Sequence, residues 1–232
     1  MKQKLLETVV AGQEREAELA ALGVDAPADP DGRWSAKDHL AHLSWWRARN
    51  ARLMDAVRTG GELPPSVQDD AQNAVIYTEN RDRTVDEIKE DARASWGLLR
   101  AAVEACSEED LARPHPYAPG FELWATVPGN GHGHLGQHLM FLYLETRDEE
   151  KAEAAQLWVR DLDTRAFPDP IDRANAAYNL ACFYGRVGNA DKALPLLRAG
   201  FDARPELIAH AREDPDLDRI RDHPAVARLL AG

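Results

Sequence analysis

The stretch WSAKDHLAHLSWW, residues 34–46, predicts the start of the long helix on which the fold depends. Ser35 and Asp38 stand three residues apart, the spacing of a capping box, which satisfies free backbone N–H groups and places negative charge at the positive helix end. Apolar or core-facing positions then recur at helical spacing: Leu40, Leu43, Trp46, Asn50 and Leu53. This stripe predicts an amphipathic helix that ends near Thr59, before GGELPP.

Helical periodicity also dominates on either side of this stretch, and β alternation is scarce. Further helices are expected over 2–22, 69–80, 84–106 and from about 131 to at least 146, with a second capping box at Thr84 and Glu87. Gly23 and the proline-rich VDAPADPDG that follows stop the first of them. Four long amphipathic helices within 147 residues predict an all-α protein built on an antiparallel four-helix bundle, with a long loop before the last helix.

The chain after the bundle has a different pattern. Six residues fall at the spacings of a tetratricopeptide repeat: Leu180, Ala181, Tyr184, Gly188, Ala193 and Pro205. This segment resembles one such helix-turn-helix repeat. A solenoid needs several repeats to bury its faces, so a single repeat is expected to dock on the bundle or on a second subunit, as in a homodimer. We therefore expect two domains, a bundle over residues 1–147 and a helical extension over 148–232.

Composition and charge narrow the class of function. The 232 residues carry a formal net charge of -12 and no clustered Lys or Arg, which argues against nucleic acid as a partner. No window is apolar enough to span a bilayer, and the amphipathic N-terminus lacks the apolar core of a signal peptide. The two cysteines have no metal-ligand spacing, which is typical of a reducing compartment. We expect a cytoplasmic protein that does not bind membranes.

Histidines gather at the start of the last predicted helix, in GNGHGHLGQHL, residues 129–139. His134 and His138 are four residues apart and so lie on one helix face, whereas His132 is about 160° away around the axis. A third imidazole from a facing helix would complete a metal site, and His42 borders the core stripe of the second helix. Three neutral imidazoles suit zinc, nickel, iron or copper and leave a ligand position open. The alternative is polar packing at a helix start without metal.

Three motifs carry a resemblance to a known family. WSAKDHLAHLSWW looks like the signature of the DinB-like four-helix bundle superfamily, closest to its ClbS/DfsB branch, in which a histidine follows the motif tryptophan by eight residues. The matching residues here are Trp34, Ser35, Lys37, Asp38 and His42. The segment DDAQNAVIY resembles that branch's Asp-x-x-Asn-x-x-x-Tyr, here Asp70, Asn73 and Tyr77. Two last-helix histidines of the family match His134 and His138.

The resemblance implies a divalent metal held by His42, His134 and His138, with zinc or nickel expected and His39 as the alternative to His42. It also implies a substrate pocket at Trp46, Asn73 and Tyr77. The superfamily includes thiol-dependent transferases and isomerases that act on small electrophiles. The ClbS/DfsB branch includes a resistance protein that resembles a hydrolase opening a cyclopropane in a genotoxin, and some of its members need no metal.

These observations lead to one expected function and two alternatives. The expected function is a metal-dependent small-molecule enzyme that hydrolyses a reactive electrophile or transfers a low-molecular-weight thiol to it, in a protective role. The first alternative is a metal-free bundle that sequesters a hydrophobic compound in a cleft lined by tryptophans. The second is an interaction protein in which the tetratricopeptide-like segment is the working part.

Overall fold

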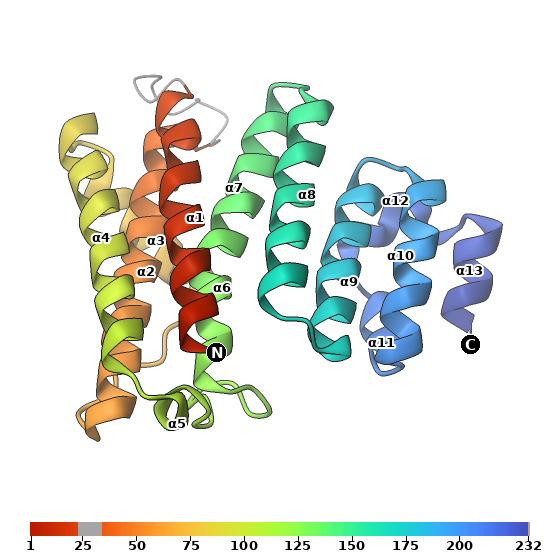
Figure 1. Ribbon diagram of the computed structural model, residues 1–232. Coiled ribbons are helices and arrows are strands. Elements are labelled where there is room, and N and C mark those ends of the chain that lie inside the picture. The colour runs from red at the N-terminus through yellow and green to blue at the C-terminus, as the bar shows by residue number, and fades with distance from the viewer. Residues whose placement is uncertain (23–33, 232) are drawn as a thin grey trace. The chain divides into compact units, whose positions relative to one another are not determined.

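All regular secondary structure in the computed structural model, which describes residues 1–22 and 34–231, is helical (Figure 1). Within these ranges there is no β-strand, only an isolated bridge between Pro114 and Glu122. The all-α prediction is confirmed. The predicted stop at Gly23 and VDAPADPDG lies outside the described residues.

The chain divides into two compact units, residues 1–138 and 139–232. This division falls inside α7 (His132–Glu145). The domain boundary expected from the sequence, at residues 147 and 148, stays a prediction.

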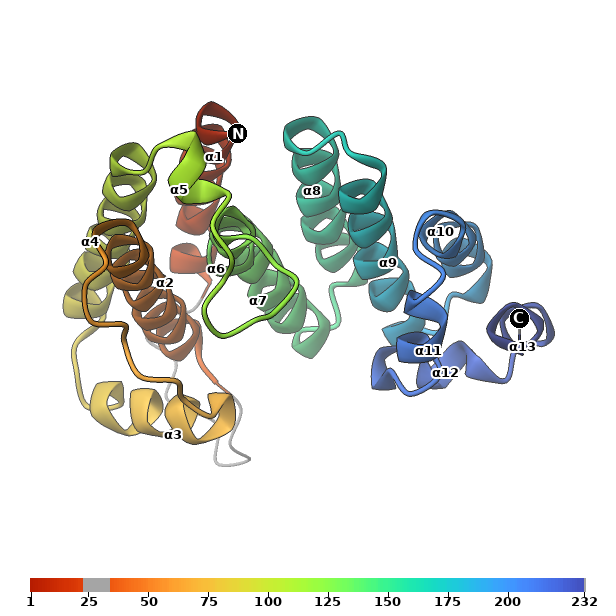
Figure 2. The same ribbon diagram turned by 90° about the horizontal axis from the view of Figure 1, so that it is seen from below.

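The first unit is a helix bundle of α1 (Lys2–Ala21), α2 (Ala36–Thr59), α4 (Val85–Ala105) and the first turns of α7. The short α3 (Asp69–Asn80) lies between α2 and α4 in the chain. It carries the chain back along the bundle, so that α2 and α4 run in the same direction while α1 and α7 run against them (Figures 1 and 2).

Hydrogen bonds at the two ends of the bundle show these directions. The ammonium of Lys37, at the start of α2, donates hydrogen bonds to the carbonyls of Arg81 and Arg83, just before α4 begins. Arg113, just after α4 and α5 (Glu108–Leu111), donates to the carbonyl of Val57 near the end of α2. The expectation of an antiparallel bundle is thereby refined, because α3 acts as a crossover between two parallel helices.

Both predicted capping boxes are present. The Ser35 hydroxyl accepts the Asp38 N–H while the Asp38 carboxylate accepts the Ser35 N–H, and Thr84 and Glu87 do the same at α4. Each such cap stabilises a helix by about 1 kcal/mol. Gly60 ends α2 with a φ of 70°, a left-handed conformation that glycine adopts without strain. Local sequence therefore fixes the starts of α2 and α4 and the end of α2.

The bundle core is largely aliphatic, with one large aromatic side chain at its centre. Leu40, Leu43 and Leu53 of the predicted α2 stripe are buried, together with Trp96 of α4. Asn50 of that stripe is also buried and donates to the carbonyl of Thr126. Trp46 lies at the edge of the stripe and is partly exposed.

The second unit contains antiparallel helices in the part of the chain where the repeat was expected. After α8 (Glu149–Ala166), α9 (Pro170–Arg186) and α10 (Ala190–Ala203) pack against each other across a turn at Gly188, which has a φ of 75°. The remaining elements are short: α11 (Leu207–Ala211), η2 (Pro215–Leu217), α12 (Asp218–Arg221) and α13 (Pro224–Ala231). A helix-turn-helix is present, and its assignment as a tetratricopeptide repeat stays a prediction.

Candidate metal site

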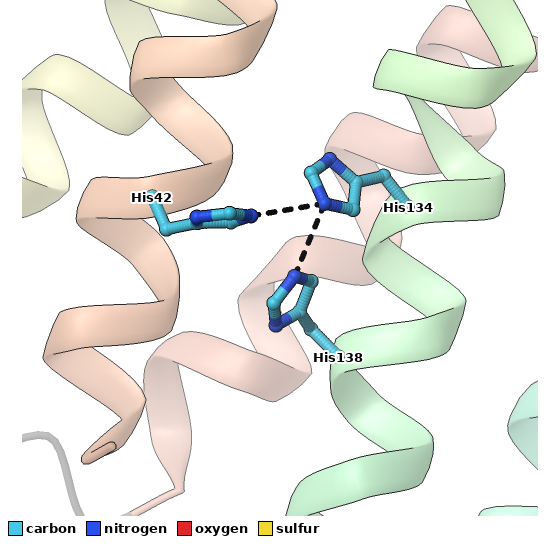
Figure 3. Close-up of side chains that lie close together, drawn as sticks. All are labelled: His42, His134 and His138. Atoms are coloured by element: carbon cyan, nitrogen blue, oxygen red, sulfur yellow. Dashed lines mark hydrogen bonds between the residues drawn. The ribbon is translucent and has the colours of Figure 1, made fainter. Parts of the chain in front are cut away.

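Three histidines from two helices of the bundle point their imidazoles toward one another. His42 comes from α2, and His134 and His138 come from successive turns of α7 (Figure 3). The Nε2 of His134 lies 3.0 Å from the Nε2 of His42 and 3.1 Å from the Nε2 of His138. One ligand nitrogen from each residue lies within 4.8 Å of the other two. The structure thus brings together the three histidines that the sequence predicts as metal ligands.

Burial keeps these rings neutral. It lowers the pKa of His42 to about 4, with a partly opposing effect of the Asn73 side chain, and the pKa of His134 to about 3. Burial also lowers the pKa of His138 well below its ordinary value, and the neighbouring histidines add to the shift. A neutral imidazole presents a lone pair, which is the form that binds a metal ion.

The arrangement fits a single divalent ion. Bonds of about 2.0 to 2.1 Å in tetrahedral geometry place two ligand nitrogens roughly 3.4 Å apart, close to the two Nε2 separations observed. The Nε2 atom of a neutral His134 carries either one proton or one lone pair, and it must share this between the Nε2 atoms of His42 and His138. Neutral rings alone therefore cannot give all three Nε2 atoms a full hydrogen bond. A cation among them would satisfy all three lone pairs. The chemistry of this donor set matches the ligands of zinc and nickel.

The other two histidines in these stretches take different positions. His39 meets the opposite ring nitrogen of His138, with 2.5 Å between the two Nδ1 atoms. The two nitrogens of an imidazole point in diverging directions, so His39 does not face the point shared by the other three rings and does not take the place of His42. His132 is buried at the first position of α7 and is outside the three-histidine cluster.

Trp34, which the sequence indicates only as a residue of the family motif, is an aromatic neighbour of the cluster. Its ring centroid lies 5.0 Å from that of His42 and 5.4 Å from that of His39, and its plane is parallel to the His138 ring at 6.4 Å. A sequence signal for this contact exists. Trp34 directly precedes the cap residue Ser35, and a residue in that position often packs on the fourth helical residue, here His39. Trp34 therefore covers one side of the histidine rings.

Of the three residues expected to line a substrate pocket, Trp46 and Asn73 lie near His42. Trp46 donates its indole N–H to the Asn73 side-chain oxygen at 3.0 Å, and its ring centroid is 6.3 Å from that of His42. Tyr77 is one turn beyond Asn73 on α3 and is partly exposed. Asp38 uses its carboxylate at the α2 cap. A pocket role for Trp46, Asn73 and Tyr77 stays a prediction.

The fold and the cluster define a helical bundle protein with a buried three-histidine site. A family model described as the DinB superfamily matches residues 24–141, and the chain belongs to that superfamily, whose members typically bind metal. Comparison with curated proteins finds no match, and comparison with solved structures finds none either. Among the described helices, none has the length and apolar character needed to cross a bilayer.

Proposed function

We propose that this protein is a metal-dependent enzyme that acts on a small reactive electrophile, by hydrolysis or by thiol transfer, and that it binds one divalent ion through His42, His134 and His138. The observation that carries the proposal is the convergence of three largely buried, neutral imidazoles on one point. A bound ion supplies Lewis acidity, which polarises an electrophile or favours deprotonation of a nucleophile. Zinc and nickel are the metals we propose, with a low-molecular-weight thiol as the co-substrate of a transferase.

The side chains around the cluster have roles that follow from their positions. The Trp34 ring covers the imidazoles and keeps water away from one side of them. Trp46 and Asn73 hold each other through their hydrogen bond, which fixes an aromatic face and an amide next to His42. An apolar wall with one fixed polar group suits a small organic substrate. The motif of Asp70, Asn73 and Tyr77 supports placement in the ClbS/DfsB branch, whose protective chemistry we propose for this chain.

Metal titration tests this proposal directly. Protein stripped with a chelator is titrated with Zn²⁺ and with Ni²⁺, and bound metal is counted by elemental analysis. We expect one equivalent for the wild type and none for His134→Asn at the same free metal concentration. His132→Asn is the matched control, because His132 is a buried histidine of the same helix outside the cluster. Circular dichroism confirms that each variant is folded.

Metal-loaded protein is then assayed for loss of a model epoxide or other strained electrophile, with and without an added thiol. Consumption that disappears in His134→Asn supports the enzyme, and its dependence on thiol separates transfer from hydrolysis. Wild-type protein that binds neither ion would contradict the metal site. The metal-free sequestering protein would then be the better proposal, and the assay would show binding without turnover.

A further inference from the structure

His39 of α2 is outside the three-histidine cluster, and it contacts His138 at the ring nitrogen that faces away from the cluster. His39 lies one turn before His42 on α2, and its Nδ1 is 2.5 Å from the Nδ1 of His138. Both side chains are buried, and their ring centroids are 4.7 Å apart. The other nitrogen of His138, Nε2, faces His134 (Figure 3). The His138 ring is therefore held at both of its nitrogens.

Elementary hydrogen-bond rules limit how the two Nδ1 atoms can face each other. A neutral imidazole has one N–H and one bare nitrogen, so exactly one of the two Nδ1 atoms carries the proton between them. If His138 donates, its Nε2 is bare and can bind an ion. If His39 donates, the single proton of His138 is on Nε2, which then points an N–H at the cluster. Only the first arrangement makes His138 a ligand.

We propose that His39 is the positioning residue that holds His138 in its ligand form, by accepting the Nδ1–H of His138 on its own Nδ1. This inference rests on the proposed metal site and goes beyond it, because it assigns a role to a residue that does not contact the ion. Histidines that bind a metal through one nitrogen usually donate the other N–H to an acceptor, which fixes the tautomer and the orientation of the ring. Here the acceptor is a second imidazole.

The surroundings of His39 fix the position of its ring and leave one of its nitrogens without a partner in the described part of the chain. When His39 accepts at Nδ1, its own proton is on Nε2, and that atom is buried with no hydrogen-bond partner among the described residues. An unpartnered buried N–H is costly. Trp34 packs edge-on against the ring at 5.4 Å and His138 occupies its other nitrogen, so His39 is fixed in place by its neighbours.

Two substitutions at position 39 separate acceptance of the hydrogen bond from packing. His39→Asn places a side-chain oxygen near the position of Nδ1 and can still accept from His138. His39→Leu has a similar size and shape but offers no acceptor. The dissociation constant for Zn²⁺ is measured by competition with a chromogenic chelator, and folding is measured by thermal unfolding of the metal-free proteins. We expect His39→Leu to lose about 10- to 100-fold in zinc affinity, and His39→Asn to recover most of that loss.

Nitrogen-15 NMR of histidine-labelled, zinc-saturated wild type gives a second readout that does not depend on any variant. We expect the proton of His138 on Nδ1 and the proton of His39 on Nε2. Equal zinc affinity in His39→Leu and wild type, or a His138 that binds zinc through Nδ1, would overturn the role of His39 while leaving the metal site intact. Failure of the wild type to bind zinc would overturn the proposed function itself, so the two failures are distinguishable.

Discussion

The guanidinium of Arg47 lies 2.6 Å from the carboxylate of Glu16 inside the bundle, joining α2 to α1. Both side chains are buried, and Trp96 donates its indole N–H to the same carboxylate at 2.9 Å. The guanidinium carbon also lies 3.8 Å from the centre of the Trp96 ring. The charge of Arg47 contributes to the lowered pKa of His134, after burial and the effect of His42. The Arg47 charge therefore lies near enough to the histidine cluster to disfavour protonation of His134.

Breaking this pair from one side should destabilise the protein more than removing both charges. Glu16→Gln leaves a buried, unpaired guanidinium, which costs about 3 to 5 kcal/mol. The double variant Glu16→Gln with Arg47→Met leaves no uncompensated charge and should be closer to the wild type. Urea unfolding of the metal-free proteins measures both effects. A single variant within 1 kcal/mol of the wild type would show that the charges are better solvated than their burial indicates.

Gly12 of α1 should resist the substitution that normally stabilises a helix. A Cβ at this position would lie 2.4 Å from the Cη2 atom of Trp96, a ring that Glu16 and Arg47 hold in place. We expect Gly12→Ala to destabilise the protein by about 1 to 3 kcal/mol through overpacking. Gly97→Ala on α4 is the matched control, because nothing lies within 4 Å of its added Cβ.

The control should gain about 0.5 to 1 kcal/mol, the usual advantage of alanine over glycine inside a helix. Thermal and urea unfolding of both variants give the comparison. Stabilisation by both substitutions would mean that the Trp96 ring shifts easily, and that the close contact between α1 and α4 does not limit the packing of the bundle.

The parts of the structure that the sequence predicted are those set by local rules. The starts of α2 and α4 follow from their capping boxes, and the shared direction of His134 and His138 follows from a spacing of four residues on one helix. The position of His42 opposite the last helix could not be predicted from local rules, since only the family motif linked the two. The crossover by α3, which makes α2 parallel to α4, has no local signal that distinguishes it from a simple antiparallel return.

The features that the sequence did not predict depend on which helices meet. Glu16 and Arg47 belong to stretches with many charged residues, where a solvated helix face is the usual interpretation, and their burial appears only when α1 packs on α2. His39 likewise has the sequence context of a ligand, and only the approach of α7 shows that it meets the far side of His138. In both features, the contact depends on which helices pack together in the fold, and the local sequence does not indicate it.

We expect no binding to duplex DNA at physiological salt. The chain carries a net charge of -12, and binding to a phosphate backbone requires clustered cations to replace counterions. A gel-shift titration with a random 30-base-pair duplex, with protein up to the micromolar range, measures this. A shift that weakens steeply with added salt would contradict the expectation and would point to a basic surface formed by the fold.

The stability of the metal-free protein should fall as pH is lowered below about 6.5. Burial lowers the pKa of His39 and His134 to about 3 and that of His42 to about 4, whereas an unfolded chain binds these protons near pH 6.5. Between those values the unfolded state binds more protons than the folded state, so the free energy of unfolding increases with pH. The stability contributed by neutral, buried histidines is present above pH 6.5 and is lost as pH falls toward 4. Each ring contributes at most about 1.4 kcal/mol per pH unit.

Replacing one of these rings should reduce that dependence. In chelator, the drop in unfolding free energy between pH 7.5 and pH 5.0 should be smaller for His134→Asn than for wild type, by at most about 2 kcal/mol. Gln137→Ala, an exposed non-titrating change on the same helix, should keep the wild-type dependence. Saturating Zn²⁺ should stabilise the wild type by a similar amount at pH 7.5 and at pH 5, because the folded rings are neutral over this whole range and protons compete with the ion for the nitrogens only near pH 4 and below. Identical pH dependence in His134→Asn and wild type would mean that His134 takes up its second proton as readily in the folded protein as in the unfolded chain.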